Sequence, residues 1–386
     1  MSSRTAIVIL NWNTRNYLEK FIPPLLESVE GLDAFVAVAD SGSTDGSIEL
    51  LTESFPSVVR IPLGENFGFT GGYNRALSEV EADYFILLNS DVEVPRGWLP
   101  PLVEWMDSHP DCGVCGPKLL SFNERSRFEY AGAAGGMLDF FGYPYCRGRV
   151  LSRTETDSGQ YDTPAGVLWV SGAAMMVRSS LWKALGGLDG RFFAHMEEID
   201  FCWRAQLAGW SIDLVPASSV YHIGGGTLPS SSPDKLFFNY RNNLLLLENN
   251  LAATLHSAFR ARVRILFRMF LDLAAALIYL LTLRPSSSKA VLRAHKDYRL
   301  LRKYKAHLPQ SPDTTEAAED RGWGASTTYK AHLPQSPDTT ETAEDRGWGA
   351  STPYKAPRPL SSAEQANAGV KGFGGLLIFK YICSIF

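Results

Sequence analysis

The most constraining feature of this chain is a short apolar run that ends abruptly in polar residues. Phe85–Leu88 is followed by Asn89, Asp91 and Glu93. So short an apolar run between polar residues predicts a buried parallel strand. Open α/β sheets bind their ligands beyond the carboxyl ends of the strands, so we expect these three side chains at a functional site. Oxygen ligands at alternate positions suit Mg²⁺ or Mn²⁺, although the same residue types also form ordinary turns.

The chain before this run alternates between strand and helix patterns. The apolar spacing predicts strands over residues 6–10, 35–39 and 58–61, and helices over residues 17–29 and 47–55. Such alternation implies parallel pairing through right-handed crossovers. We expect Pro23 and Pro24 to distort or split the first helix, because proline removes a backbone donor.

The composition is globular, with 45 % hydrophobic and 20 % charged residues. A formal net charge of −4 gives no reason to expect a nucleic-acid partner. The five cysteines have no framework spacing, and we interpret Cys112 and Cys115 as small strand residues rather than a redox or zinc pair. Because Met1 leads almost directly into the first strand, we expect a reducing cytosolic setting.

Two further segments predict ligand contacts at strand ends. Asp40 closes the second strand, where its carboxylate could accept hydrogen bonds from a ligand or cap the following turn. A glycine-rich stretch that contains Asn66 and Gly68 opens a helix, where backbone N–H groups and the helix dipole could face phosphate. This stretch matches neither common phosphate-binding fingerprint, and glycine also serves tight turns.

The order of these motifs resembles family 2 glycosyltransferases of the GT-A fold. Within them the chain is similar to the rhamnosyltransferase-like group of bacterial cell-surface polysaccharide assembly. The resemblance covers roughly residues 4–245 and rests on these motifs in order: Asn11-Trp-Asn13, Asp40–Ser47, Asn66-Phe-Gly68, Leu88–Asp91, Trp169–Arg178, Gly186–Phe193, His195–Arg204 and Val220–Thr227.

The resemblance implies an α/β, Rossmann-like nucleotide-sugar domain with a mostly parallel central sheet. It implies that Asp40 contacts the nucleotide base. The expected nucleotide-sugar-binding residues are Asn11, Asn13, Asp40, Asn66, Gly68 and Asn89. Asp91 takes the family's metal-coordinating position, the last residue of a DxD-type motif whose first acid is here Asn89. Glu93 is a further candidate ligand, and His222 falls on the family's metal-ligating histidine.

By the same resemblance the catalytic base is Glu198, with Glu197 as the alternative, since the family usually has Glu-Asp here. The residues themselves indicate two acids at a helix N-terminus, where the dipole stabilises negative charge. Two neighbouring acids also repel each other, which would raise the pKa of one of them. We expect Asp200 to pair with Arg204 on that helix. His222 could equally be structural.

The last third of the chain differs in character. Residues 260–305 are strongly basic around an apolar run, 269–283, that is shorter than the roughly 20 residues of a spanning helix. We expect a helix lying on an anionic membrane surface; a buried helix with a basic face is the alternative. We divide the chain into a catalytic domain (1–245), a basic helical membrane-associating segment (246–305) and a tandem-repeat, disordered tail (306–386) with an apolar end.

The sequence therefore predicts an inverting glycosyltransferase at the inner face of the cell membrane. It would use Mg²⁺ or Mn²⁺, a nucleotide diphosphate-sugar donor and a glycan or lipid-linked acceptor bound near a loop-rich insertion (128–163). A sugar nucleotidyltransferase would need a basic glycine-rich loop after the first strand, which Asn11–Thr14 does not supply. The other alternative is a membrane-associated nucleotide-sugar-binding or scaffold protein with a decayed active site.

Overall fold

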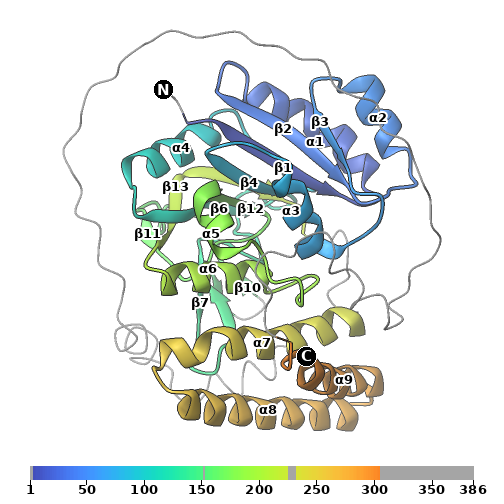
Figure 1. Ribbon diagram of the computed structural model, residues 1–386, viewed down its shortest axis with the longest axis vertical. Coiled ribbons are helices and arrows are strands. Elements are labelled where there is room, and N and C mark those ends of the chain that lie inside the picture. Colours follow the sequence, from blue (N-terminus) through green and yellow to red (C-terminus); the bar gives the residue numbers. More distant parts are fainter. Residues whose placement is uncertain (1–2, 151–152, 225–231, 305–386) are drawn as a thin grey trace.

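The computed structural model describes residues 3–150, 153–224 and 232–304, and a mixed sheet forms their centre (Figure 1). The strand order is β11-β13-β6-β12-β4-β1-β2-β3, with β5 paired to β13. The strands are β1 (Thr5–Asn11), β2 (Ala34–Asp40), β3 (Val59–Pro62), β4 (Tyr84–Asn89), β5 (Val92–Glu93), β6 (Cys112–Ser121), β11 (Ala165–Gly166), β12 (Ala174–Arg178) and β13 (Ser211–His222).

One half of the sheet is parallel, as the sequence predicts. Strands β3, β2, β1 and β4 all run in the same direction. Their register pairs Asn11 with Asp40 and Leu10 with Asn89. The polar strand ends therefore lie side by side at one edge of the sheet, where an open α/β fold binds its ligands.

The other half of the sheet is mixed. Strand β12 lies antiparallel between β4 and β6, while β6 and β13 are parallel to each other. The short β5 pairs antiparallel with the end of β13, which sets His222 opposite Val92. This pairing brings the end of β13 beside Asp91, the residue that precedes β5.

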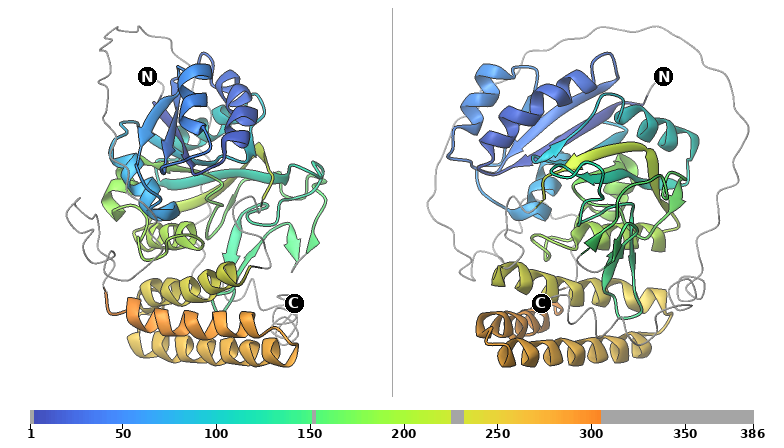
Figure 2. Two further views of the ribbon diagram at one scale, coloured as in Figure 1. Left: turned by 90° about the vertical axis from the view of Figure 1, so that its right-hand side faces the viewer. Right: turned by 180° about the vertical axis from the view of Figure 1, so that it is seen from behind.

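Helices cover both faces of the sheet. One apolar core lies beneath α1 (Arg15–Ser28), α2 (Ser47–Ser54) and α4 (Leu99–Ser108). The core of the other face includes side chains of α3 (Gly68–Ser78), α5 (Ser179–Leu185), α6 (Glu197–Leu207) and α7 (Pro233–Thr254). Beyond α7, the helices α8 (Ala258–Leu281) and α9 (Pro285–Leu301) complete a helical layer at one end of the molecule (Figures 1 and 2).

Two small hairpins interrupt the connection between β6 and β12, within the insertion predicted to be loop-rich. They pair β7 (Gly136–Leu138) with β8 (Pro144–Cys146) and β9 (Arg149–Val150) with β10 (Arg153–Thr154). The β7–β8 hairpin reaches from the sheet towards the helical layer (Figure 1). Asn243 of α7 donates a hydrogen bond to the carbonyl oxygen of Gly142 in its turn, at 2.6 Å.

Helix α1 is not split, although it contains Pro23 and Pro24. The two prolines leave the carbonyl groups of Glu19 and Lys20 without their usual helical donors. Both residues are exposed, so water can hydrogen-bond these carbonyl groups. The expected interruption is therefore tolerated on the solvent side of the helix.

The expected domain boundary at residue 245 falls inside α7. Leu244 and Leu245 of this helix belong to the apolar core of the sheet domain, whereas Phe237 and Tyr240 pack in a separate cluster with α8 and α9. Helix α7 thus joins the sheet domain to the helical layer. The predicted tail, 306–386, lies outside the described residues. Among those described, no helix has the length and apolar content to cross a membrane.

Candidate active site

The polar residues at the ends of β1 and β2 form one hydrogen-bonded cluster. Asn11 Nδ2 donates to Asp40 Oδ2 at 2.7 Å and to Ser43 Oγ at 3.0 Å. Asp40 Oδ1 accepts the backbone N–H groups of Gly42 at 3.0 Å and Ser43 at 2.8 Å. Asp40 Oδ1 therefore holds the turn that follows β2, the capping role considered from the sequence, while Oδ2 binds Asn11 at the end of β1.

Asn13 and Asn89 flank this cluster. Asn13 is exposed with a positive φ of 54°, and its side-chain oxygen accepts the Thr44 N–H at 2.8 Å. Asn89 is half-buried at the end of β4, and its backbone N–H donates to the Ala173 carbonyl at 3.0 Å. Both side chains thus lie at the sheet edge to which the sequence assigned them.

The glycine-rich loop contacts the segment that leads to the predicted catalytic acids. Asn66 Oδ1 accepts the Gly68 N–H at 2.9 Å. Gly68 has a φ of +70°, and a Cβ there would lie 2.5 Å from the Phe193 ring and 2.7 Å from the Phe193 carbonyl oxygen. The Thr70 N–H donates to that same oxygen at 3.2 Å. Glycine is therefore required at position 68 for this close approach.

Asp91 and His222 form a buried pair with a third residue that the sequence did not indicate. His222 Nε2 lies 3.1 Å from Asp91 Oδ1, and His222 Nδ1 lies 3.7 Å from Glu129 Oε1. Burial alone lowers the pKa of His222, but the charges and hydrogen bonds of the two carboxylates outweigh it and raise that pKa to about 10. Burial raises the pKa of Asp91, but His222 outweighs this and leaves it below its usual value.

This pair has a geometry that fits a divalent cation. Two adjacent ligands of an octahedral ion at about 2.1 Å lie about 3 Å apart, close to the separation of Asp91 and His222. A metal-ligating imidazole commonly has a carboxylate beside its other nitrogen, the position of Glu129. Metal binding here would release the imidazole proton. Within the described part of the chain, no three His, Cys, Asp or Glu side chains form a metal-binding group by themselves.

Glu93 is engaged elsewhere. It forms an ion pair with Arg125 at 2.7 Å and lies opposite Tyr221 in the β5–β13 pairing. Asp91 lies in the turn before β5, so the strand alternation that would aim both acids to one side does not apply. The structure does not bring Glu93 into contact with His222.

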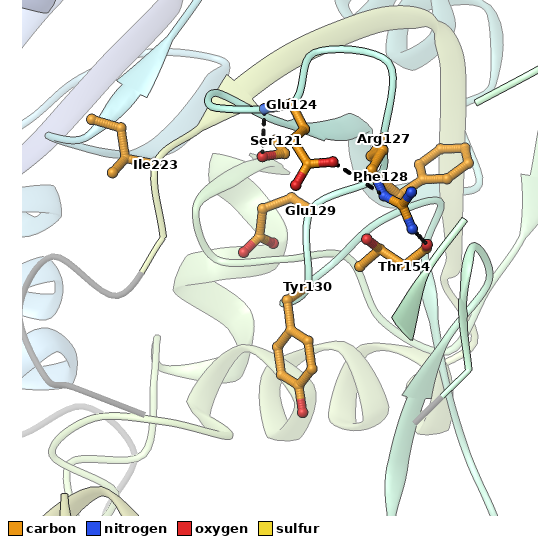
Figure 3. Close-up of a pocket in the computed structure, with 8 residues that line it drawn as sticks. All are labelled: Ser121, Glu124, Arg127, Phe128, Glu129, Tyr130, Thr154 and Ile223. Carbon is orange, nitrogen blue, oxygen red and sulfur yellow. Dashed lines mark hydrogen bonds and ion pairs between the residues drawn. The ribbon is translucent and has the colours of Figure 1, made fainter. Parts of the chain in front are cut away.

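A pocket of about 240 Å³ opens beside Glu129 (Figure 3). Tyr130, which also lines it, is more than half exposed, and Ile223 contributes another part of the wall. The remaining lining residues are Ser121, Glu124, Arg127, Phe128 and Thr154. Glu129 thus lies between this open space and His222.

Glu197 and Glu198 begin α6, as predicted. Glu197 is buried, whereas Glu198 is half-buried. Each has one carboxylate oxygen that is buried without a hydrogen-bond partner. Burial raises the pKa of Glu198 to about 7. Burial, together with the neighbouring charge of Glu198, raises the pKa of Glu197 well above its usual value. Glu198, the more accessible acid, is thus the one whose pKa suits proton transfer near neutrality.

Glu198 lies close to the end of β4. A Cβ at Gly172 would be 3.5 Å from Glu198 Cβ and 3.4 Å from the Phe69 ring of the glycine-rich loop. The residue after Gly172 is Ala173, which accepts the Asn89 N–H. The structure therefore gathers the glycine-rich loop, the end of β4 and the acid pair around Gly172.

A strained turn precedes these acids. Phe193, His195 and Met196 have φ values of 64°, 71° and 73°, although none is glycine. Each such residue costs on the order of 1 kcal/mol, and clusters of them are typical of functional sites. Asn242 of α7, which is fully buried, holds the turn: its Nδ2 lies 2.7 Å from the carbonyl oxygens of both Ala194 and His195.

Neighbouring polar residues of α7 extend this support. Arg241 donates to the Phe192 carbonyl at 2.8 Å. Asn249 and Asn250 both donate to Asp200 Oδ1, at 2.8 and 2.9 Å, while Arg204 binds its other oxygen at 2.7 Å as expected. Sequence reasoning missed this set. The available signal was a pair of asparagines, 242–243, that recurs seven residues later in a leucine-rich helix and so lies on the same face.

The sequence and the fold are both similar to those of known glycosyltransferases. Residues 6–183 match the family model described as Glycosyl transferase family 2, which confirms the resemblance. The crystal structure of GalNAc-T7 with UDP, GalNAc and Mn²⁺ shares the fold, with a TM-score of 0.51 and 15 % identity over 64 % of this chain and 48 % of that chain. The fold is the α/β GT-A architecture, with the helical layer added.

The characterised relatives include rhamnosyltransferases and other proteins of polysaccharide biosynthesis. N-acetylglucosaminyl-diphospho-decaprenol L-rhamnosyltransferase of Mycobacterium tuberculosis is 27 % identical over 307 residues, 74 % of this chain and 96 % of the relative. Rhamnosyltransferase WbbL of Escherichia coli is 24 % identical over 226 residues, 56 % of this chain and 82 % of the relative. This chain is accordingly similar to family 2 glycosyltransferases over residues 6–183, and its relatives include bacterial rhamnosyltransferases.

The raised pKa of Glu198 generates a prediction about pH. If Glu198 is the base, it must be ionised, so kcat should rise with pH through a midpoint near 7. Glu198→Gln should lose this dependence along with most of the activity.

The raised pKa of Glu198 also affects stability. Because the folded protein keeps a proton that the unfolded chain loses above about pH 4.5, Glu198 lowers the free energy of unfolding as pH rises. Glu198→Gln should therefore raise the melting temperature at pH 8.

Glu197→Gln is the matched comparison, since it replaces the adjacent acid, whose pKa is held well above its usual value, without changing Glu198. Because burial, rather than a charge on Glu197, raises the pKa of Glu198, we expect the kinetic midpoint to stay near 7 while turnover persists. Loss of turnover in Glu197→Gln with near-normal turnover in Glu198→Gln would instead assign the base to Glu197.

The turn held by Asn242 generates a second prediction. Asn242→Ala should lower kcat by about 10²-fold with little change in the KM for donor, because a displaced acid loses its reactive geometry. Asn243→Ala is the matched control: it is equally buried on the same helix but donates to Gly142. The two variants should lose similar stability in thermal unfolding, while only Asn242→Ala loses kcat. If both variants lose kcat equally, Asn242 contributes only to the stability of the fold and does not position Glu198.

Proposed function

We propose that this protein transfers a sugar, with inversion, from a nucleotide diphosphate-sugar to a hydroxyl of a glycan or lipid-linked glycan. The observation that carries the proposal is the half-buried acid Glu198, with a pKa near 7, beside the polar end of β4. The rhamnosyltransferase relatives favour a hexose or deoxyhexose as the transferred sugar and polysaccharide assembly as the setting.

The donor occupies the edge of the sheet where the strands of the parallel half end. Asn11, Asn13 and Asp40 shape the base-binding side, and Asn66 and Gly68 form the loop across it. Because the Asp40 carboxylate already holds its own turn, its contact with the base uses lone pairs left over from those hydrogen bonds. Asn89 lies next to this set at the end of β4.

Glu198 takes the proton from the acceptor hydroxyl as that oxygen attacks the anomeric carbon. The bond from the anomeric carbon to the diphosphate oxygen breaks in the same step, and the nucleotide diphosphate departs. Burial raises the pKa of Glu198 to about 7, and burial together with the charge of Glu198 raises the pKa of the adjacent Glu197 well above its usual value. The turn held by Asn242 fixes the direction from which Glu198 approaches.

Asp91 and His222 are the residues that would hold Mg²⁺ or Mn²⁺, with Glu129 orienting the imidazole. The bound ion supplies charge neutralisation for the departing diphosphate. Glu93 remains a candidate only if its ion pair with Arg125 opens. The crystal structure of GalNAc-T7 holds UDP and Mn²⁺ on the same fold, which supports a divalent ion here.

The acceptor is proposed to bind at the pocket beside Glu129, where Tyr130 offers an exposed aromatic face (Figure 3). A lipid-linked acceptor would bring the protein to the inner face of the cell membrane as a peripheral protein. The Mycobacterium tuberculosis relative is named for an acceptor of this kind, a decaprenyl diphosphate-linked sugar.

A panel of nucleotide-sugars, assayed with Mg²⁺, Mn²⁺ or EDTA and with membrane extract as acceptor, tests the reaction. We expect one donor to release its nucleoside diphosphate in a metal-dependent manner, with deoxyhexose donors the first to try. Binding of a nucleotide-sugar without release under any of these conditions would favour the alternative, a scaffold with a decayed active site.

The metal pair is tested by Asp91→Ala and His222→Ala. Each should abolish transfer and weaken Mn²⁺ binding in the presence of nucleoside diphosphate, measured by electron paramagnetic resonance, without lowering the melting temperature enough to unfold the protein. Glu93→Ala, measured in parallel, should weaken Mn²⁺ binding much less, because Glu93 faces Arg125. Undiminished Mn²⁺ binding by Asp91→Ala would exclude this residue as a ligand.

A further inference from the structure

Helix α8 exposes a continuous apolar stripe along its length. The exposed large side chains are Phe259, Val263, Leu266, Phe267, Phe270, Leu273, Leu277, Leu280 and Leu281. At 100° per residue they fall within an arc about 140° wide. Phe270 is 65 % exposed and Leu281 is 73 % exposed. The described residues leave this stripe uncovered, and soluble proteins rarely expose a contiguous apolar patch of this length.

The stripe carries no exposed charge between Arg262 and Arg284. Arg268 and Asp272 of α8 are buried together at 2.9 Å. The guanidinium of Arg264, on the flank of the stripe, lies 3.8 Å from the centre of the Phe140 ring. The uninterrupted apolar surface therefore extends over most of the helix.

A second segment, distant in the sequence, joins this surface. The turn of the β7–β8 hairpin lies against α8, where the Phe141 ring stacks on Phe267 with ring centres 5.3 Å apart. The neighbouring Phe140 is 60 % exposed. Helix α8 lies at the outer edge of the helical layer, at the end of the molecule opposite β3 (Figures 1 and 2). The apolar face thus has two parts, the stripe of α8 and Phe140.

Positive charge surrounds the two ends of this face. Arg260 and Arg262 are exposed at the start of α8, and Arg284 and Lys289 are exposed just beyond its end. The single acid of α8, Asp272, is fully buried. If α8 packed against α8 of a second copy, basic residues would meet basic residues in both a parallel and an antiparallel arrangement. No exposed acid of the helix would neutralise this repulsion. An anionic partner with an apolar interior suits this charge pattern better.

We propose that the stripe of α8 and Phe140 form a docking face that lies in the interface of an anionic lipid bilayer. A helix of this kind lies in the membrane plane, with its apolar side chains at the acyl boundary and its basic ends among the headgroups. This inference deepens the membrane contact of the proposed function by naming its surface. The test of the docking face involves no sugar transfer. The docking face and the proposed glycosyltransferase activity can therefore fail independently.

The test compares vesicle binding of full-length variants. Leu266→Glu/Phe270→Glu changes two exposed side chains of the stripe, and Leu32→Glu/Val59→Glu changes two exposed apolar residues of the sheet domain as a matched control. Co-sedimentation uses vesicles of phosphatidylcholine with phosphatidylglycerol and of phosphatidylcholine alone. We expect wild type and the control to bind the mixed vesicles, and the α8 variant to bind them at least about tenfold more weakly.

Three results would overturn the proposal. Undiminished binding of the α8 variant would place the contact elsewhere in the chain, for example in the apolar residues 374–386. Equal binding to vesicles with and without phosphatidylglycerol would show that docking does not require an anionic headgroup. Light scattering that shows a lipid-free dimer of wild type and a monomer of the α8 variant would assign the face to a second copy of the chain. Circular dichroism of each variant checks that it is folded.

Discussion

The arrangement of the active site depends on one set of hydrogen bonds, those that Asn242 makes to the turn before α6. Three residues of this turn are in the left-handed region without being glycine, so the turn needs external support. A single buried amide supplies much of it by facing the carbonyl oxygens of Phe192, Ala194 and His195. Since α6 starts directly after the turn, the direction of Glu198 is set by a helix that begins 35 residues later.

The acid pair explains why such support is needed. Glu197 and Glu198 lie at a helix N-terminus, which favours negative charge, yet burial opposes it and each leaves a carboxylate oxygen without a hydrogen-bond partner. A segment with these properties would move its acids towards water if it were free to do so. The contacts of Asn242, Arg241 and the asparagines at Asp200 hold the turn in place. The proposed base, Glu198, therefore stays in a position where burial raises its pKa.

The sequence predicted the parts of the site whose signal is local. A strand that ends in Asn11, Asp40 or Asn89 can be read from a few neighbouring residues, and the parallel register then aligns these ends. The inverted strand β12 and the carboxylate of Glu129 could not be predicted in this way, because each depends on pairing between distant segments. Glu93 shows where a local pattern misleads. The sequence predicted that Asp91 and Glu93, as alternate residues of a strand, point to the same side. Asp91 lies in a turn, so strand alternation does not apply to it.

Helix α7 also connects the proposed membrane-docking face to the turn before α6. Asn242 faces the turn of the acids, while the next residue, Asn243, donates to the hairpin turn at Gly142 and accepts a hydrogen bond from Arg268 of α8. Adjacent residues on one helix thus hold the turn before Glu198, the hairpin and the helix with the apolar stripe. Because these contacts are buried, a surface that fixed α8 against a bilayer would also fix the height of Glu198 above it. A lipid-linked acceptor would then reach the base at a defined depth.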